Sequence, residues 1–164
     1  MNNMQYQFHT QKGITAVEIL IAVSIAAVVL ITASYSIFNF VNSAREVAEK
    51  TQALYLAEDG LELTRYVRDN AWTHISMLSL NTPYYLDVTS SYVHITTSPE
   101  TVGNFSRSIA FQNVYRDSTT DDIVASTTSG SVADNNSKYV TVTVTWGSPT
   151  KTVSLGSILA NLNP

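Results

Sequence analysis

The sequence feature that most constrains this chain is an uncharged apolar stretch near its N-terminus. Residues 19–44 contain no Asp, Glu, Lys, Arg or His, although a few Ser, Thr and Asn residues occur among them. A helix needs about 20 predominantly apolar residues to cross the roughly 30 Å hydrocarbon core of a bilayer, and this stretch is longer than that. We therefore expect a helix that is inserted in a membrane.

A single carboxylate stands directly before this stretch. Glu18 precedes residue 19, and Lys12 and Gly13 lie a few residues upstream. On insertion scales, a charged side chain at the centre of a membrane helix costs about 2.5–3.5 kcal/mol. Such a residue is by default a candidate for function, so we expect Glu18 to have a charged partner.

The sequence KGITAVE of residues 12–18, with the apolar stretch after it, resembles the type III signal of type IV pilins and of type II secretion pseudopilins. The resemblance implies a leader of residues 1–13, which ends in Lys12 and Gly13 and is removed by a prepilin peptidase. It also implies that cleavage falls between Gly13 and Ile14, that Ile14 is then methylated, and that Glu18 pairs with the N-terminal amine of a neighbouring subunit. Ile14 and Ala16 replace the usual phenylalanine and leucine, and no proline interrupts residues 14–81, which favours a minor pilin or pseudopilin.

Simple electrostatics gives a reason for this spacing. Removal of residues 1–13 would create an α-amine with a pKa near 8, mostly cationic at neutral pH, at the start of an apolar helix. A second, staggered helix could bring its Glu18 to that amine, so that each charge would relieve the desolvation of the other. A secretory signal peptide fits less well, because its apolar region is typically about 7–15 residues long. An ordinary single-pass anchor fits the length but does not account for Glu18.

Composition limits the other functions. The chain has 164 residues, enough for one membrane helix and one small head. Its net charge of −4, with no basic cluster, makes direct nucleic-acid binding unlikely, and the lack of cysteine excludes disulfides and thiolate metal sites. His9, His74 and His94 show no ligand spacing, and no nucleophile motif is present. We expect no enzymatic activity, no cofactor and no metal site.

The rest of the chain predicts an α+β head, residues 45–164, after a membrane and assembly helix over residues 14–44. Residues 45–70 carry charges without a helix breaker and predict an amphipathic continuation of the same helix. Its expected apolar face comprises Ala44, Val47, Ala48, Thr51, Leu54, Tyr55 and Leu61. A small antiparallel sheet is expected within residues 84–159, most clearly as a hairpin of strands 138–146 and 151–155. The long helix is expected to pack on this sheet.

Residues 117–137 are rich in Ser, Thr, Asp, Asn and Gly and predict a surface loop. Asp117, Asp121, Asp122 and Asp134 could offer oxygen ligands to calcium, but the regular Asp-x-Asp-x-Asp-Gly pattern is absent. Whether this segment binds calcium stays open.

Two function classes remain. The first is a structural subunit of a type IV pilus-like or type II secretion filament, whose partners are a prepilin peptidase and other pilin subunits. It would cross the inner membrane once, with the head outside the cytoplasm, before it joins a pilus or pseudopilus. The second is a membrane-anchored extracytoplasmic binding module with no filament role. The sequence does not choose among pilus, secretion and competence systems.

Overall fold

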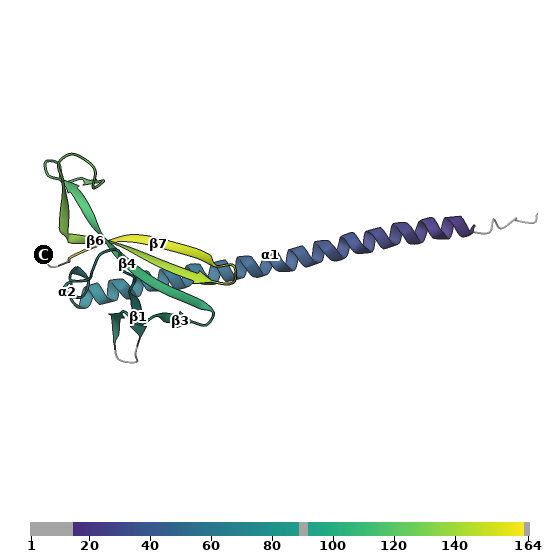
Figure 1. Cartoon of the computed structure of the whole chain (residues 1–164), viewed down its shortest axis with the longest axis horizontal. Helices are drawn as coiled ribbons and strands as arrows, with labels where there is room; N and C mark the ends of the chain where they lie inside the picture. The colour runs from purple at the N-terminus through teal and green to yellow at the C-terminus, as the bar shows by residue number, and fades with distance from the viewer. Residues whose placement is uncertain (1–14, 89–91, 163–164) are drawn as a thin grey trace, which may run out of the picture. The chain divides into compact units, whose positions relative to one another are not determined.

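The computed structural model describes residues 15–88 and 92–162, and it confirms the expected α+β fold (Figure 1). A long apolar N-terminal helix is followed by a head built on antiparallel strands. The elements are α1 (Ala16–Asn70), α2 (Thr73–Ser76), β1 (Tyr85–Val88), β2 (Val93–Thr96), β3 (Glu100–Val102), β4 (Phe105–Asp117), β5 (Ile123–Val124), β6 (Ser131–Trp146) and β7 (Lys151–Ala160). The chain forms two compact units, one ending at Glu46 and one beginning at Val47, and α1 contributes to both.

The first unit consists, among the described residues, of the N-terminal part of α1. Every described side chain of this part is exposed. The helix is long and apolar enough to cross a membrane. Because the part up to Glu46 buries none of its apolar side chains, the stability of this unit must come from an environment outside the chain.

The head is organised around a five-stranded antiparallel sheet. Its strands follow the order β3-β4-β6-β7, and β5 adds to β4 at a separate position. The expected hairpin is confirmed: β6 and β7 pair from Trp146 opposite Lys151 to Ser137 opposite Ala160. Strands β1 and β2 form a separate two-stranded sheet, linked to β4 by a bridge between Tyr84 and Ile109.

The period of two in β6 places its apolar residues in the core. Val140, Val142 and Val144 are fully buried, and Trp146 is nearly so. The same alternation in β4 buries Phe105, Ile109 and Phe111 beside them. Alternate residues of a strand point to opposite faces, so one face of the sheet forms the core and the other faces away from it.

The helix face that covers this core differs from the expected one. Of the predicted apolar set only Leu61 is buried, whereas Val47 and Tyr55 are 64% and 67% exposed. The buried residues of α1 are Ala53, Ala57, Gly60, Leu61, Thr64 and Val67. Most of these residues are small, because the helix approaches the sheet too closely for large side chains. A pattern that looks for large apolar residues therefore selects the wrong face.

The segment 117–137, expected to be a surface loop, is mostly exposed turn and coil, but strands form at both of its ends and at β5. The sheet extends through it, with Tyr115 opposite Val124 and Asp117 opposite Ser131. A register shift between Asn113 and Val114 marks where this extension begins. The prediction missed these strands because polar side chains indicate exposure and give no information on backbone hydrogen bonds to neighbouring strands.

Gly60 is the point where α1 comes closest to the sheet. A Cβ atom built on Gly60 would lie 2.8 Å from Cγ1 of Val142 and 3.0 Å from Cδ of Arg107. Real Cβ atoms do not approach a neighbour so closely, and Val142 is a stiff, fully buried residue that has little room to move. Gly60 therefore permits close packing, which a glycine within a helix otherwise disfavours by roughly 1 kcal/mol.

We predict that Gly60→Val lowers the free energy of unfolding by about 1–3 kcal/mol, because overpacking forces the helix away from the sheet. The measurement is chemical denaturation of the full chain in detergent micelles, followed by tryptophan fluorescence. Gln52→Val is the matched control, since it adds the same side chain to an exposed position of the same helix. Equal losses in the two variants would contradict the close-packing role.

Candidate functional site

The sequence-predicted site residues fall at the start of α1. Lys12, Gly13 and Ile14 lie outside the described residues. The cleavage and methylation positions therefore stay predictions from the sequence. Glu18 lies in the first turn of α1, where it is exposed. A negative charge there interacts favourably with the helix dipole by about 0.3–1 kcal/mol.

Thr15 caps this first turn, a role that the sequence analysis missed. Glu18 N–H donates to the Thr15 carbonyl oxygen at 3.0 Å and lies 3.4 Å from Thr15 Oγ1. Thr15 and Glu18 are three residues apart at a helix start, which is the spacing of a capping box. The Thr-x-x-Glu pattern was the available signal. These contacts use the backbone N–H of Glu18. In a capping box the glutamate side chain can also bond back to the N-cap N–H, so a test of the Glu18 charge should keep that capacity.

Four hydroxyl side chains in the apolar stretch donate back to the helix. Each of these donors reaches a carbonyl three or four residues earlier, so its proton needs no water. The donor–acceptor distances are 2.7 Å from Ser24 to Leu20, 3.0 Å from Thr32 to Val28, 2.8 Å from Ser34 to Leu30 and 2.9 Å from Ser36 to Thr32. Internal satisfaction of polar groups is what a helix requires in hydrocarbon.

Large apolar side chains are exposed around the whole circumference of this part of α1. Leu30, Ile31 and Phe40 are 68%, 70% and 74% exposed, and successive residues Val28 to Ile31 are all more than half exposed. A soluble monomer rarely presents a continuous apolar surface of this kind. The segment therefore needs lipid or other helices as its environment.

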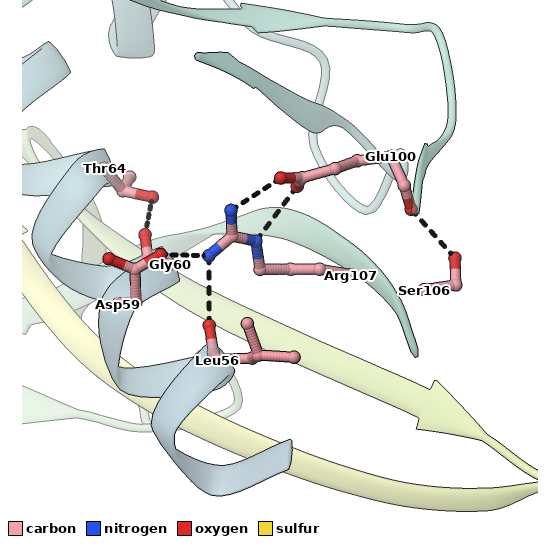
Figure 2. A network of polar contacts seen from close by, with 7 residues as sticks. All are labelled: Leu56, Asp59, Gly60, Thr64, Glu100, Ser106 and Arg107. Carbon is pink, nitrogen blue, oxygen red and sulfur yellow. Dashed lines mark hydrogen bonds and ion pairs between the residues drawn. The ribbon is translucent and has the colours of Figure 1, made fainter. Parts of the chain in front are cut away.

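In the head, Arg107 fastens α1 to the sheet. Figure 2 shows its guanidinium between Glu100 of β3 and the carboxylate and carbonyl of the helix residues Asp59 and Leu56. Nε and Nη2 donate to the two carboxylate oxygens of Glu100 at 2.9 Å and 2.6 Å. Nη1 donates to Asp59 Oδ2 at 2.7 Å and to the Leu56 carbonyl at 3.1 Å. One side chain thus joins three elements.

This arginine is 2% exposed, so its charge depends on these partners. Burial lowers the pKa of Arg107, but the hydrogen bonds and charges of Glu100 and Asp59 outweigh that effect and raise the pKa above its ordinary value. The side chain is therefore always charged. A charged residue at a position that alternates with Phe105 and Ile109 was a visible sign of a buried ion pair, which the sequence analysis did not use.

A second polar contact joins α1 to the β6–β7 hairpin. Trp146 Nε1 donates to Glu49 Oε2 at 3.1 Å, and Lys151 Nζ lies 3.4 Å from the same oxygen. The indole ring also packs against Phe105, with ring centroids 5.7 Å apart. Trp146 is therefore part of the core, with its one polar atom satisfied by the helix.

Two of the four aspartates of residues 117–134 accept hydrogen bonds within the protein through their side chains. Asp134 accepts from Arg116 Nε at 2.8 Å, and this hydrogen bond lowers the pKa of Asp134. Asp117 accepts from the backbone N–H groups of Thr119 and Thr120 at 2.7 Å and 3.1 Å, which lowers the pKa of Asp117. These hydrogen bonds give both carboxylates a structural role.

Two of the histidines, His74 and His94, come closer together than their spacing indicated, and His9 lies outside the described residues. His74 and His94 line the same cleft of about 520 Å³, beside Tyr66 and Leu78. His94 Nε2 lies 3.3 Å from Asp87 Oδ2. Across residues 15–88 and 92–162, no group of three or more metal-binding side chains is found.

Comparison of the chain with protein-family models, with curated proteins and with solved structures finds no match.

We predict that Arg107→Met lowers the free energy of unfolding by about 3 kcal/mol, because Glu100, whose side chain is 14% exposed, loses its charge partner. Asp59 is 57% exposed and can be solvated, so it adds little to the loss. The same denaturation measurement on the full chain tests this. Arg65→Met is the control, since Arg65 of α1 pairs with Glu62 in an exposed position, where such a pair contributes about 0–1 kcal/mol. Its other bond, to Ser157 Oγ of β7 at 3.3 Å, leaves no unpaired charge when it is lost. Comparable losses for the two arginines would show that Arg107 does not fasten the helix to the sheet.

Proposed function

We propose that this chain is a minor pilin or pseudopilin, a structural subunit of a type IV pilus-like or type II secretion filament. Its leader is cleaved after Gly13, Ile14 is methylated, and α1 crosses the inner membrane once with the head on the extracytoplasmic side. Subunits then assemble through α1. The observation that carries the proposal is the position of Glu18 in the first turn of α1. It is the one charged residue of residues 15–44, directly before the uncharged stretch 19–44.

The exposed apolar surface of α1 fits a protein that lies first in a membrane and then in a filament. The part up to Glu46 buries no described side chain, while the part from Val47 packs on the sheet of the head. Lipid can cover the apolar surface before assembly, and helices of neighbouring subunits can cover it afterwards. A helix that served only one soluble domain would have no use for this uncovered surface.

The charge on Glu18 gives assembly its register. In a medium of low dielectric constant, a lone carboxylate or amine carries a desolvation penalty of several kcal/mol. Pairing of Glu18 with the N-terminal amine of a neighbouring chain compensates for both penalties. It is possible at only one axial displacement of the two helices. Other displacements leave both charges unpaired and are disfavoured.

The alternative is a membrane-anchored binding module outside the cytoplasm. Such a protein would use the same apolar helix and the same head. It would need neither cleavage after Gly13 nor an acidic residue at position 18. Processing and charge dependence therefore separate the two functions.

We predict that the mature protein begins at methylated Ile14. The measurement is the intact mass and N-terminal sequence of the full-length product, taken from membranes of cells that contain a prepilin peptidase. Gly13→Ala should stay uncleaved, and cells with an inactivated peptidase should yield the wild-type precursor. A wild-type chain that still begins at Met1 in peptidase-containing cells would favour the anchored module.

We predict that Glu18→Gln inserts and folds normally but enters filaments at least about tenfold less than wild type, because the charge pair is lost. Glutamine can also occupy this capping-box position, so the variant removes the charge and keeps the cap. The readout is the ratio of subunit in sheared filaments to subunit in membranes. Normal incorporation of Glu18→Gln alongside failure of Glu18→Ala would assign Glu18 to helix capping alone.

A further inference from the structure

The outer face of the five-stranded sheet carries no charged side chain over most of its area. The buried positions of β4, β6 and β7 alternate with positions that point away from the core. Arg107 and Lys138 occupy buried positions, so their charges are turned away from the outer face. The outward residues are Ser106, Ser108, Ala110 and Gln112 of β4, Tyr139, Thr141, Thr143 and Thr145 of β6, and Thr152, Ser154, Gly156, Ile158 and Ala160 of β7.

The register arranges many of these residues as rows of hydroxyl groups across the strands. Ser108 lies opposite Thr143, and Thr143 lies opposite Ser154. Thr143 Oγ1 and Ser154 Oγ are 3.0 Å apart and share a hydrogen bond. Each hydroxyl can both donate and accept, so the rows offer both kinds of partner.

One end of this face opens into a cleft of about 440 Å³. On one side Asn81 N–H donates to the Phe111 carbonyl, and on the other Val124 of β5 lies opposite Tyr115. The cleft lies between these two contacts with β4. No charged residue lines it within the described chain. Residues that line it include Asn81, Gln112, Tyr115, Val124, Tyr139 and Ile158.

Tyr139 extends across the neighbouring strand at the edge of this cleft. A Cβ atom on Gly156 would lie 1.9 Å from Tyr139 Oη and 2.5 Å from its Cζ, so the ring occupies the space that a side chain would fill. The tyrosine is 37% exposed. Gln112 Nε2 donates to Asn81 Oδ1 at 3.1 Å, which fixes the amide beside it.

We propose that this cleft and the adjoining hydroxyl rows bind a neutral polysaccharide. The exposed tyrosine ring can pack against the apolar C–H face of a sugar ring, and amide and hydroxyl groups can pair with sugar hydroxyls. A polymer without charge brings no ion that the cleft would have to desolvate unpaired. An anionic polymer would find no cation in the cleft and would meet a chain of net charge −4. The proposal holds for a filament subunit and for an anchored module alike.

The test uses the full chain in an amine-oxide detergent, which has no sugar headgroup to compete. The probes are suspensions of cellulose, chitin, starch, mannan and agarose, with heparin beads as the anionic comparison. Co-sedimentation should show retention on at least one neutral polymer and none on heparin. Tyr139→Ala and Gln112→Ala should each weaken that retention at least about tenfold, as expected for residues central to a contact.

Tyr55→Ala is the matched control, because Tyr55 is an exposed tyrosine of α1 away from the sheet face and its loss should leave binding unchanged. Each variant is first checked by thermal melting, and Gln112→Ala keeps the test decisive if Tyr139→Ala unfolds. Absence of retention on all five neutral polymers would overturn the proposal. Equal retention on heparin, or wild-type binding by a folded Gln112→Ala, would overturn it as well.

Discussion

The close approach of α1 to the sheet at Gly60 is the constraint on which the rest of the head depends. The Arg107 side chain passes α1 at the same point. Its Cδ lies 3.0 Å from the place that a Cβ atom on Gly60 would occupy. Its guanidinium then bonds the helix through Asp59 and Leu56, and β3 through Glu100. Dispersion contacts and a buried ion pair thus act at one place, and either would be weakened if the helix moved outward. The small residues of the buried helix face follow from this distance.

The two units differ in the surroundings that they need. The head buries Val142, Phe111 and Leu159 completely, whereas α1 up to Glu46 exposes apolar side chains on every side. The hydroxyls of Ser24, Thr32, Ser34 and Ser36 donate to their own helix. Glu18 is the one charged side chain of residues 15–44. A chain of this kind is incomplete without lipid or other helices. In the proposed filament, neighbouring helices cover this apolar surface. The proposed polysaccharide cleft lies instead on a face of the head that is uncharged and open to water.

Several elements could be predicted because their signal is local. The apolar stretch predicted the membrane-competent helix, and strict alternation in residues 138–146 predicted the β6–β7 hairpin. The KGITAVE segment of residues 12–18, which ends in Glu18, indicated the candidate site, although residues 12–14 lie outside the described chain. The Thr15 cap was visible in the Thr-x-x-Glu pattern and was overlooked. The buried face of α1 was predicted wrongly and the strands within residues 117–137 were missed, since both depend on neighbours distant in sequence.

By itself, the sequence determined the length of the apolar helix, the place of its one carboxylate and the antiparallel hairpin at the C-terminus. These features depend on residues close together in the chain, where periodicity and charge act directly. Only the tertiary structure decided which face of α1 is buried, that Arg107 joins Glu100 to Asp59, and that uncharged residues of three strands form one surface with a cleft. Those features depend on strand register and on the distance between helix and sheet, and both result from packing the whole head at once.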